Sequence, residues 1–556
     1  MSALWIPIII IGLIWRIRFF REIVRFLHIL QLEGYDHHRL QSWIQADRGR
    51  LPPRAERYAI VGLLLIGAAP YLIKVENFEP FFLTLPAIAL TIELYLLVRP
   101  RRPKPKKRLV YTARAIRLLV VTFILAFISL AAGLRNLPLS SGSIEIFYLP
   151  TARFIVLTLL WNQLAPFALV TANLLLRPVE ETIQRAYLRS ARRKLHKLRP
   201  KVIGITGSYG KTSTKYILES VLSGAYRVLK TPESYNTPMG ICRAIREYLS
   251  PEHEIFIVEM GAYGRGEVAA LCDLVGPEIG ILTAIGSQHL ERFKDLETIT
   301  ETKYELIASL PEGGLAVFNA DDPRCAKSAD RTEIKGRLRV VRYGIEPSDD
   351  PNHLTLSARE IEFDGTGTTF TVESRETGET ARFHTPLLGQ ANVSNILAAT
   401  AVAVAYGVGL AEVGRTVETL QPIPHRLQPI AGAGGVTVID DAYNANPVGA
   451  RIALELLSQF PAGRKVLVTP GLIELGPLEA EENRRLGAEA ARVCDYVILV
   501  GPERTFPIWE GLQAADFPTE RTIVVHDLDE ATEQLKEILT PGDVVLFEND
   551  LPDNYL

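Results

Sequence analysis

The sequence predicts a helical membrane region followed by α/β domains, and three observations support this fold class. Apolar residues make up 47% of the 556 residues, and their excess lies before residue 177. After Lys201, short apolar runs alternate with amphipathic segments, which is typical of parallel α/β layers. A glycine-rich turn at residues 207–212 joins the first of these runs to a helical pattern. A chain of this length has room for roughly three or four domains.

Five apolar segments before residue 177 are expected to be membrane-spanning helices. The last is long enough to cross a bilayer, the middle three are short but sufficient, and the first is equally compatible with an interfacial helix. Buried helices of a soluble domain are the alternative interpretation. The segments are Ala3–Trp15, Tyr58–Ile73, Phe81–Val98, Leu118–Leu134 and Phe154–Leu176.

The charges between these segments predict an orientation. Residues 99–108 carry seven basic residues and no acidic one, and residues 177–201 carry nine basic and two acidic residues. Residues 74–80 and 135–145 have no basic excess. Because basic loops stay in the cytoplasm, we expect five spans with the N-terminus outside. This predicts a multi-pass protein of the cell (plasma) membrane, with the later domains in the cytoplasm.

Composition excludes several other classes of protein. A net charge of −2 argues against nucleic acid as a partner bound through overall charge. The four cysteines show no paired spacing, which argues against a disulfide framework and against a zinc site. Unpaired thiols are typical of a reducing compartment.

The stretch "KVIGITGSYGKTSTKYILESVL" (201–222) predicts a phosphate-binding loop. Val202–Ile205 has the pattern of a buried strand, and Thr214–Leu222 that of an amphipathic helix. Backbone N–H groups of a turn between them can surround phosphate oxygens, while Lys211 reaches the β- and γ-phosphates and Thr212 ligates Mg²⁺. An ordinary glycine turn with a surface lysine is the alternative. The nucleotide-binding candidates in the loop are Thr206, Gly207, Ser208, Gly210, Lys211, Thr212 and Ser213.

Polar residues follow the later apolar runs. Glu259 ends the run at 254–259, His289 follows the run that starts at 279, and Lys303 lies on a predicted helix. Asn319 and Asp322 follow the run at 314–318. Ligands of open α/β sheets bind at the carboxyl ends of strands, so we expect these side chains and Thr212 to converge on one nucleotide.

Residues 201–556 resemble the Mur ligases, the ATP-dependent amide ligases that build the stem peptide of peptidoglycan. Within this family, the branch that adds D-alanyl-D-alanine is the most similar. The resemblance implies a P-loop central ATPase domain, a Rossmann-like C-terminal ligase domain, and the use of ATP and Mg²⁺. The motifs that carry it are "TGSYGKT" (206–212), "PHRLQPI" (424–430), "IDDAYNANP" (439–447) and "TPGLIELG" (469–476).

The resemblance also implies roles for single residues. Thr212 and Glu259 would hold one Mg²⁺ ion, and His289 and a carbamoylated Lys303 the other. The adenine-binding asparagine of the family matches Asn319. Arg426 would contact the γ-phosphate, and Asp441 would lie near the ribose and the γ-phosphate. The expected catalytic set is Lys211, His289, Lys303 and Arg426, and Asp322 is expected to help bind the nucleotide.

The expected domains are a transmembrane region (1–180), a basic linker (181–200), an ATP-binding central domain (201–423) and a C-terminal ligase domain (424–556). Two departures from the family concern the substrates. Mur ligases begin with a domain that grips a uridine diphosphate group, whereas this chain has apolar segments there. Glu548, Asn549 and Asp550 stand where the branch carries Lys-Gly-Ser-Arg.

The expected function is therefore ATP-dependent, ADP-forming amide ligation. An acyl phosphate would form on a cell-wall peptide precursor, and an amino acid or a D-alanyl-D-alanine-like dipeptide would then attack it. Partners would be ATP, the precursor, the amine donor and the lipid bilayer, and the acceptor is either soluble or lipid-linked. The alternatives are a ligase for another peptide or polymer such as polyglutamate, a non-catalytic membrane scaffold in wall synthesis, and a transport ATPase.

Overall fold

The computed structural model of the chain describes residues 2–46, 58–65, 79–98, 108–134, 144–346, 354–364, 367–443 and 445–551. These residues form two compact units. The first extends to Ile183, and the second comprises Gln184–Asp550.

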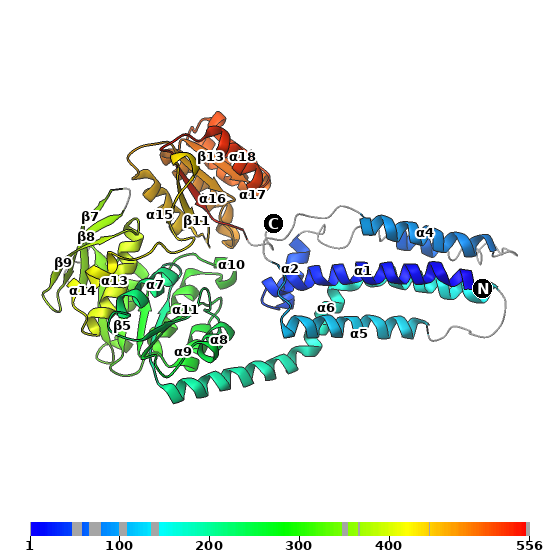
Figure 1. The fold of residues 1–556 in the computed structure, drawn as a ribbon, viewed down its shortest axis with the longest axis horizontal. Helices are drawn as coiled ribbons and strands as arrows, with labels where there is room; N and C mark the ends of the chain where they lie inside the picture. The colour runs from blue at the N-terminus through cyan, green and yellow to red at the C-terminus, as the bar shows by residue number, and fades with distance from the viewer. Residues whose placement is uncertain are drawn as a thin grey trace. The chain divides into compact units, whose positions relative to one another are not determined.

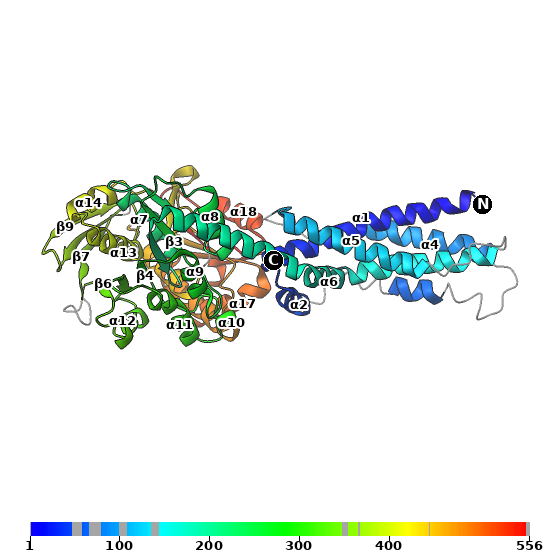
Figure 2. The same ribbon diagram turned by 90° about the horizontal axis from the view of Figure 1, so that it is seen from below.

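The described residues of the first unit are mainly helical. Helices α1, α4, α5 and the first part of α6 lie side by side (Figure 1), and a second view agrees (Figure 2). Phe19 packs edge-on against both Phe123 and Trp161 in their core. The helices are α1 (Ser2–Leu32), α2 (His37–Ala46), α4 (Glu79–Val98), α5 (Ala113–Leu134) and α6 (Ile144–Leu198), and residues 58–65 are also helical.

The prediction of a multi-pass protein of the cell (plasma) membrane is wrong. In the part of the chain that the structure describes, two helical stretches are long and apolar enough to cross a membrane, Ala113–Ala132 and Arg153–Leu198, where five were expected. The physical reason is that many of the apolar residues assigned to lipid contact pack against other helices. Ile11, Leu85 and Ala89 are buried in one cluster. Part of the predicted segment Tyr58–Ile73 lies outside the described residues.

The second unit begins with a mostly parallel sheet. Its strands are paired in the order β2-β3-β1-β4-β5-β6-β7-β8-β9, with β1 between β3 and β4 and with antiparallel pairing from β7 to β9. The strands are β1 (Lys201–Thr206), β2 (Val228–Lys230), β3 (Ile255–Glu259), β4 (Ile279–Leu282), β5 (Leu315–Asn319), β6 (Arg339–Ile345), β7 (Leu356–Phe363), β8 (Thr368–Ser374) and β9 (Thr380–Thr385).

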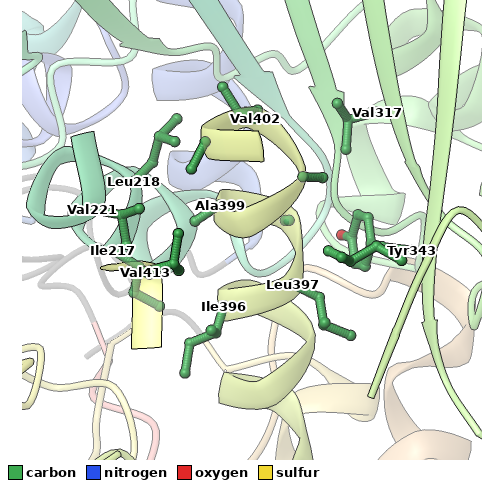
Figure 3. Packing of buried hydrophobic residues seen from close by; sticks show 14 of the residues in the cluster. Ile217, Leu218, Val221, Val317, Tyr343, Ile396, Leu397, Ala399, Val402 and Val413 are labelled. Atoms are coloured by element: carbon green, nitrogen blue, oxygen red, sulfur yellow. The ribbon is translucent and has the colours of Figure 1, made fainter. Parts of the chain in front are cut away.

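Helices cover both faces of this sheet. On one face, α13 and α7 pack side by side against the sheet, with Ala399 and Val402 near Leu218 (Figure 3). On the other face, a second cluster includes Phe256, Leu271 and Leu306. The helices are α7 (Lys211–Leu222), α8 (Pro238–Glu247), α9 (Glu267–Val275), α10 (Leu290–Phe293), α11 (Leu296–Ala308), α12 (Pro323–Ala329), α13 (Gln390–Ala405) and α14 (Leu410–Val417).

A further α/β domain follows in the same unit. Its strands are paired in the order β10-β11-β15-β12-β13-β14, and all pairs are parallel except β10 with β11. The α/β part of the fold prediction is therefore confirmed. The elements are β10 (Gln428–Ala431), β11 (Thr437–Asp441), α15 (Pro447–Ser458), β12 (Lys465–Thr469), α16 (Glu479–Val493), β13 (Tyr496–Val500), α17 (Pro502–Ala514), β14 (Thr522–Val525), α18 (Leu528–Ile538) and β15 (Val544–Glu548).

Candidate active site

The turn between β1 and α7 needs glycine at two positions. Gly207 has φ 152°, and a Cβ atom there would lie 2.1 Å from Thr283 Oγ1. Gly210 has φ 82° and precedes the first residue of α7, and its Cβ would lie 2.7 Å from Asn395 Oδ1. Both the conformation and the close packing exclude larger residues. The turn thereby presents backbone N–H groups at the N-terminus of α7, an arrangement that favours anions.

Hydrogen bonds fasten the turn to the segment after β4. The Ser208 N–H donates to Ala284 O at 2.7 Å, and its hydroxyl donates to Gly286 O at 3.0 Å. The Thr283 hydroxyl donates to Tyr209 O at 2.5 Å. Thr206 is fully buried, and its hydroxyl donates to Met260 O at 3.0 Å. Ser213 is buried in the first turn of α7. These contacts hold the loop in one shape.

Lys211 is the first residue of α7. Its Nζ donates to Gly207 O at 2.6 Å and to Ser208 O at 3.1 Å, so the ammonium group lies over the turn. Burial lowers the pKa of Lys211 to about 8, partly offset by Glu259. A phosphate group at the turn would favour the charged form, because opposite charges at short distance stabilise each other.

Glu259, at the end of β3, joins several groups near the loop. Its Oε2 accepts hydrogen bonds from Thr212 Oγ1 at 3.1 Å and from Lys215 Nζ at 2.9 Å. Its Oε1 accepts one from Asn236 Nδ2 at 3.2 Å. Burial alone would raise the pKa of Glu259, but Lys215 and Lys211 outweigh burial and hold the pKa below its ordinary value. Glu259 is therefore a carboxylate at neutral pH.

Lys215 is a residue of the site that the sequence analysis missed. It is fully buried, and besides Glu259 its Nζ contacts the backbone oxygen of Glu233. The available signal was its spacing of four residues from Lys211, which places both lysines on the same face of α7. Lys215 fixes the position of the Glu259 carboxylate.

Lys303 lies on α11 and is 4% exposed. Burial and, to a lesser extent, the charge of Lys211 lower its pKa to about 7. Its Nζ lies 5.8 Å from the centre of the Phe293 ring. Much of this amine is therefore neutral at physiological pH, which is the form that reacts with CO₂ to give a carbamate.

The strand that we expected to end near His289 is shorter than predicted. β4 ends at Leu282, and His289 precedes α10 in a left-handed conformation with φ 56°. Its Nδ1 contacts Glu474 Oε2, and its ring packs edge-on against Tyr263. Burial lowers the pKa of His289, although Glu474 opposes this effect. Neutral imidazole is the form that binds metals.

Asn319 and Asp322 lie close to the loop, but their side chains bond to the backbone. Asn319 Nδ2 donates to Thr283 O at 2.9 Å, and its Oδ1 accepts from the Asp321 N–H. Asp322 caps α12 and also accepts from the Ile285 N–H at 2.9 Å. Both side chains therefore position the segment after β4, which in turn holds the loop.

Arg426 and Asp441 lie at the start of the C-terminal domain. Arg426 NH1 donates to Tyr443 O at 2.7 Å, and its charge lowers the pKa of Lys211. Asp441 Oδ1 accepts from the Leu427 N–H at 3.1 Å. Burial raises the pKa of Asp441 to about 6, while Arg426 opposes the shift. The structure thus brings Arg426 into electrostatic range of both Lys211 and Asp441.

The donor set fits Mg²⁺ bound together with a nucleotide. Thr212 and Glu259 offer oxygen ligands beside the loop. Among the residues that the structure describes, no three His, Cys, Asp or Glu side chains cluster as a metal site. Mg²⁺ is usually held by one or two carboxylates together with waters and substrate phosphates, and Glu259 is such a carboxylate.

Comparison with known proteins agrees with this geometry. The family model of the Mur ligase middle domain matches residues 205–403, and that of the Mur ligase, glutamate ligase domain matches residues 425–548. Glu259, Lys303 and Asn319 lie within the first match, and Arg426 and Asp441 within the second.

Individual proteins match over the same region. The UDP-N-acetylmuramoyl-tripeptide–D-alanyl-D-alanine ligase of Mycobacterium bovis is 35% identical over 370 residues, which is 62% of this chain and 70% of that protein. The ligase of the same name from Bacillus subtilis is 31% identical over 396 residues, which is 71% of this chain and 82% of that protein. The crystal structure of MurF ligase from Thermotoga maritima in complex with ADP is 28% identical with a TM-score of 0.57, and the match covers 66% of this chain and 80% of that chain. The chain therefore belongs to the Mur ligase family, the ATP- and Mg²⁺-dependent amide ligases of peptidoglycan synthesis.

Proposed function

We propose that this enzyme joins D-alanyl-D-alanine to the peptide of UDP-N-acetylmuramoyl-tripeptide. The name of the relatives from Mycobacterium bovis and Bacillus subtilis supports these substrates. The observation that carries the ligase chemistry is the grouping of Lys211, Thr212 and Glu259 at the loop, with Arg426 in electrostatic range.

The proposed roles follow from charge and position. Lys211 and Arg426 neutralise the transferring phosphoryl group, which is the main task of a protein in phosphoryl transfer. Thr212 and Glu259 hold one Mg²⁺ ion, and His289 and carbamoylated Lys303 hold the other. Bound Mg²⁺ neutralises the developing charge on the phosphate oxygens. The remaining loop residues bind phosphate through their backbone, and Asn319, Asp322 and Asp441 complete the nucleotide site.

The reaction has two steps. A carboxylate oxygen of the tripeptide attacks the γ-phosphorus of ATP, and ADP leaves, which gives an acyl phosphate. The nitrogen of the dipeptide then attacks the carbonyl carbon, a C–N bond forms, and phosphate departs with the C–O bond pair. The amine loses its proton in this step.

Purified full-length protein tests the proposal. With ATP, Mg²⁺, UDP-N-acetylmuramoyl-tripeptide and D-alanyl-D-alanine, it should release one ADP for each amide product, both measured by mass spectrometry. Lys211→Ala should reduce ADP release by roughly 10²- to 10³-fold, as expected for loss of a group that stabilises transition-state charge. Arg415→Ala, an exchange on α14 away from the loop, is the control. Product formation within a few-fold of wild type in Lys211→Ala would remove this lysine from the mechanism.

A lipid-linked peptide is the second candidate for the acceptor. This candidate requires that the helical first unit contacts lipid. Exposed apolar side chains on α5 support this candidate. They include Val120, Ile124 and Phe127, whose exposed fractions are 51%, 49% and 66%. Contiguous exposed apolar surfaces mark contacts with proteins or lipids. The same peptide presented on a lipid in vesicles should then react faster than the UDP-linked peptide. Equal rates would dismiss this candidate.

We also propose the domain limits 1–180, 181–200, 201–423 and 424–556. Limited proteolysis of the full chain should cut first near residues 181–200 and near 424. Cleavage inside 201–423 that is as fast as cleavage near residues 181–200 or near 424 would contradict these limits.

A further inference from the structure

The turn before β10 contains two residues in an unfavourable backbone conformation. His425 has φ 59° and Leu427 has φ 45°, and Arg426 lies between them. Residues other than glycine are uncommon in this left-handed region. Such conformations persist only where surrounding contacts hold them, and they are concentrated at functional sites. The turn must therefore be held by contacts outside its own backbone.

Two neighbouring aspartates of β11 hold the turn at these two positions. His425 Nδ1 lies 2.7 Å from Asp440 Oδ2, and because a carboxylate can only accept, Nδ1 is the donor. The Leu427 N–H donates to Asp441 Oδ1 at 3.1 Å. Asp440 is itself fixed, since it lies in a strand and its Oδ1 accepts from the Ala442 N–H at 3.1 Å. Each left-handed residue thus has one aspartate as its partner.

The contact between His425 and Asp440 contributes little to the stability of the fold. The side chain of His425 is 59% exposed, and that of Asp440 is 16% exposed. Water competes for exposed polar contacts, so they add little to the free energy of unfolding. Folding stability therefore does not explain why the chain keeps a strained histidine at this position.

Arg426 is the residue that the strained turn carries. Its NH1 donates to Tyr443 O at 2.7 Å, and its guanidinium carbon lies 4.8 Å from the centre of the Tyr443 ring. It lies in electrostatic range of Lys211 in the phosphate-binding loop. The direction of a side chain depends on the backbone conformation around it. A relaxed turn would therefore point the guanidinium group of Arg426 in another direction.

We propose that His425 is a positioning residue, which together with Asp440 holds the turn so that Arg426 faces the γ-phosphate of bound ATP. This inference rests on the proposed function, in which Arg426 neutralises the transferring phosphoryl group. His425 acts through Arg426 and does not itself contact the nucleotide. Loss of His425 therefore weakens the contact with the γ-phosphate, while the loop at 206–213 still binds the rest of the phosphate chain.

Calorimetry on the full chain in the presence of Mg²⁺ tests this proposal with two nucleotides. AMP-PNP, an ATP analogue, carries a γ-phosphate group, and ADP does not. His425→Ala should bind AMP-PNP about tenfold more weakly than wild type does, because a hydrogen bond between charged groups is misplaced. It should bind ADP within about twofold of wild type, whereas a general structural defect would weaken both nucleotides alike. His526→Ala removes an exposed histidine from the same domain and is the control.

A conservative variant and a double variant sharpen the test. Asparagine tolerates the left-handed conformation, and its side-chain N–H group can take the place of the histidine Nδ1 donor. His425→Asn should therefore bind AMP-PNP within about threefold of wild type. Because His425 acts through Arg426, adding His425→Ala to Arg426→Ala should cause no further loss of AMP-PNP affinity.

The positioning role is wrong if His425→Ala binds AMP-PNP as tightly as wild type does, or if it loses affinity for both nucleotides equally. It is also wrong if His425→Asn shows no recovery, or if His425→Ala has its full effect in the Arg426→Ala background. These measurements need no acceptor. Wild type that binds AMP-PNP but makes no amide from UDP-N-acetylmuramoyl-tripeptide and D-alanyl-D-alanine would refute the proposed substrates instead.

Discussion

At the scale of single residues, burial sets the charge of the lysines around the loop. Burial holds the pKa values of Lys211, Lys303 and Lys215 below their ordinary value, and of the three Lys215 is the one in direct contact with a carboxylate, that of Glu259. The same residue type thus serves different purposes. The amine of Lys303 is partly neutral at pH 7, as the proposed carbamate requires, whereas Lys215 positions the Glu259 carboxylate.

Lys303 gives the first prediction at this scale. Its amine has a pKa of about 7, so the neutral form that takes up CO₂ increases as pH rises through 7 and declines below it. Wild type should therefore lose activity below about pH 7 when bicarbonate is removed, and added bicarbonate should restore it. Lys303→Ala should be about 100-fold slower and recover partly with short carboxylic acids, which replace the anionic ligand. Steady-state ADP release measures both effects.

The control for this prediction is Lys327→Ala, a lysine on α12. It should show the bicarbonate dependence of wild type. A crystal structure with unmodified Lys303 in an enzyme of full activity would reject the carbamate.

At the scale of elements, two helices with the same N-terminal geometry allow a matched experiment. Gly210 precedes α7 and Gly266 precedes α9, and both have φ 82°. A Cβ at Gly210 would lie 2.7 Å from Asn395 Oδ1, whereas a Cβ at Gly266 would have no neighbour within 4 Å. An alanine at either position would have to adopt the left-handed conformation, which costs roughly 1–2 kcal/mol. Only at Gly210 would its methyl group also collide with a neighbouring side chain.

Gly210→Ala should therefore weaken ADP binding at least about tenfold, because the loop must shift to accept the methyl group. Gly266→Ala should bind ADP within about twofold of wild type, despite a similar loss of stability. Calorimetric titration with ADP and thermal melting of both variants provide the measurements. Equal loss of affinity in the two would show that strain, and not contact with Asn395, governs the loop.

Local elements were predictable from the sequence, and side-chain partners were not. β1 and α7 were expected because an apolar run, a glycine turn and a helical pattern are all encoded within 22 residues. Asn319 and Asp322 were correctly placed after a strand, but their bonds to Thr283 and Ile285 depend on a segment over 30 positions earlier. The long helix α1 extends well beyond the apolar stretch Ala3–Trp15, since its later part is amphipathic and packs on neighbouring helices.

At the scale of the whole molecule, Glu474 makes one of the contacts that join the two α/β domains of the second unit, beside the packing of Phe363 on Phe460. Glu474 contacts His289 and also lies 3.5 Å from Arg292 NH2. The Glu291 N–H donates to Glu474 O at 3.1 Å. Glu474 belongs to the stretch "TPGLIELG", which indicated the family. The stretch did not predict the contact between Glu474 and His289. A proposed metal ligand is thereby oriented by the opposite domain.

Glu474→Gln should reduce kcat about tenfold, because His289 loses a hydrogen bond to a charged group. The amide of Glu291 should exchange hydrogen faster, since the contact between the domains opens more often. Mass spectrometry of exchanged peptides and steady-state kinetics measure these effects. Glu489→Gln on α16, whose side chain pairs with Arg451, is the control. Unchanged exchange at Glu291 would show that the link does not hold the domains.

The strand order of the C-terminal sheet has a consequence for how the enzyme is made. β15 is the last of these strands in the chain, yet it lies between β11 and β12. During translation, two parts of this sheet are made before β15. They are the pair β10–β11 and the group β12–β13–β14, and each has open strand edges, which are prone to wrong pairing. The final strand closes both edges. A nascent chain thus carries its phosphate-binding loop long before the C-terminal sheet is complete.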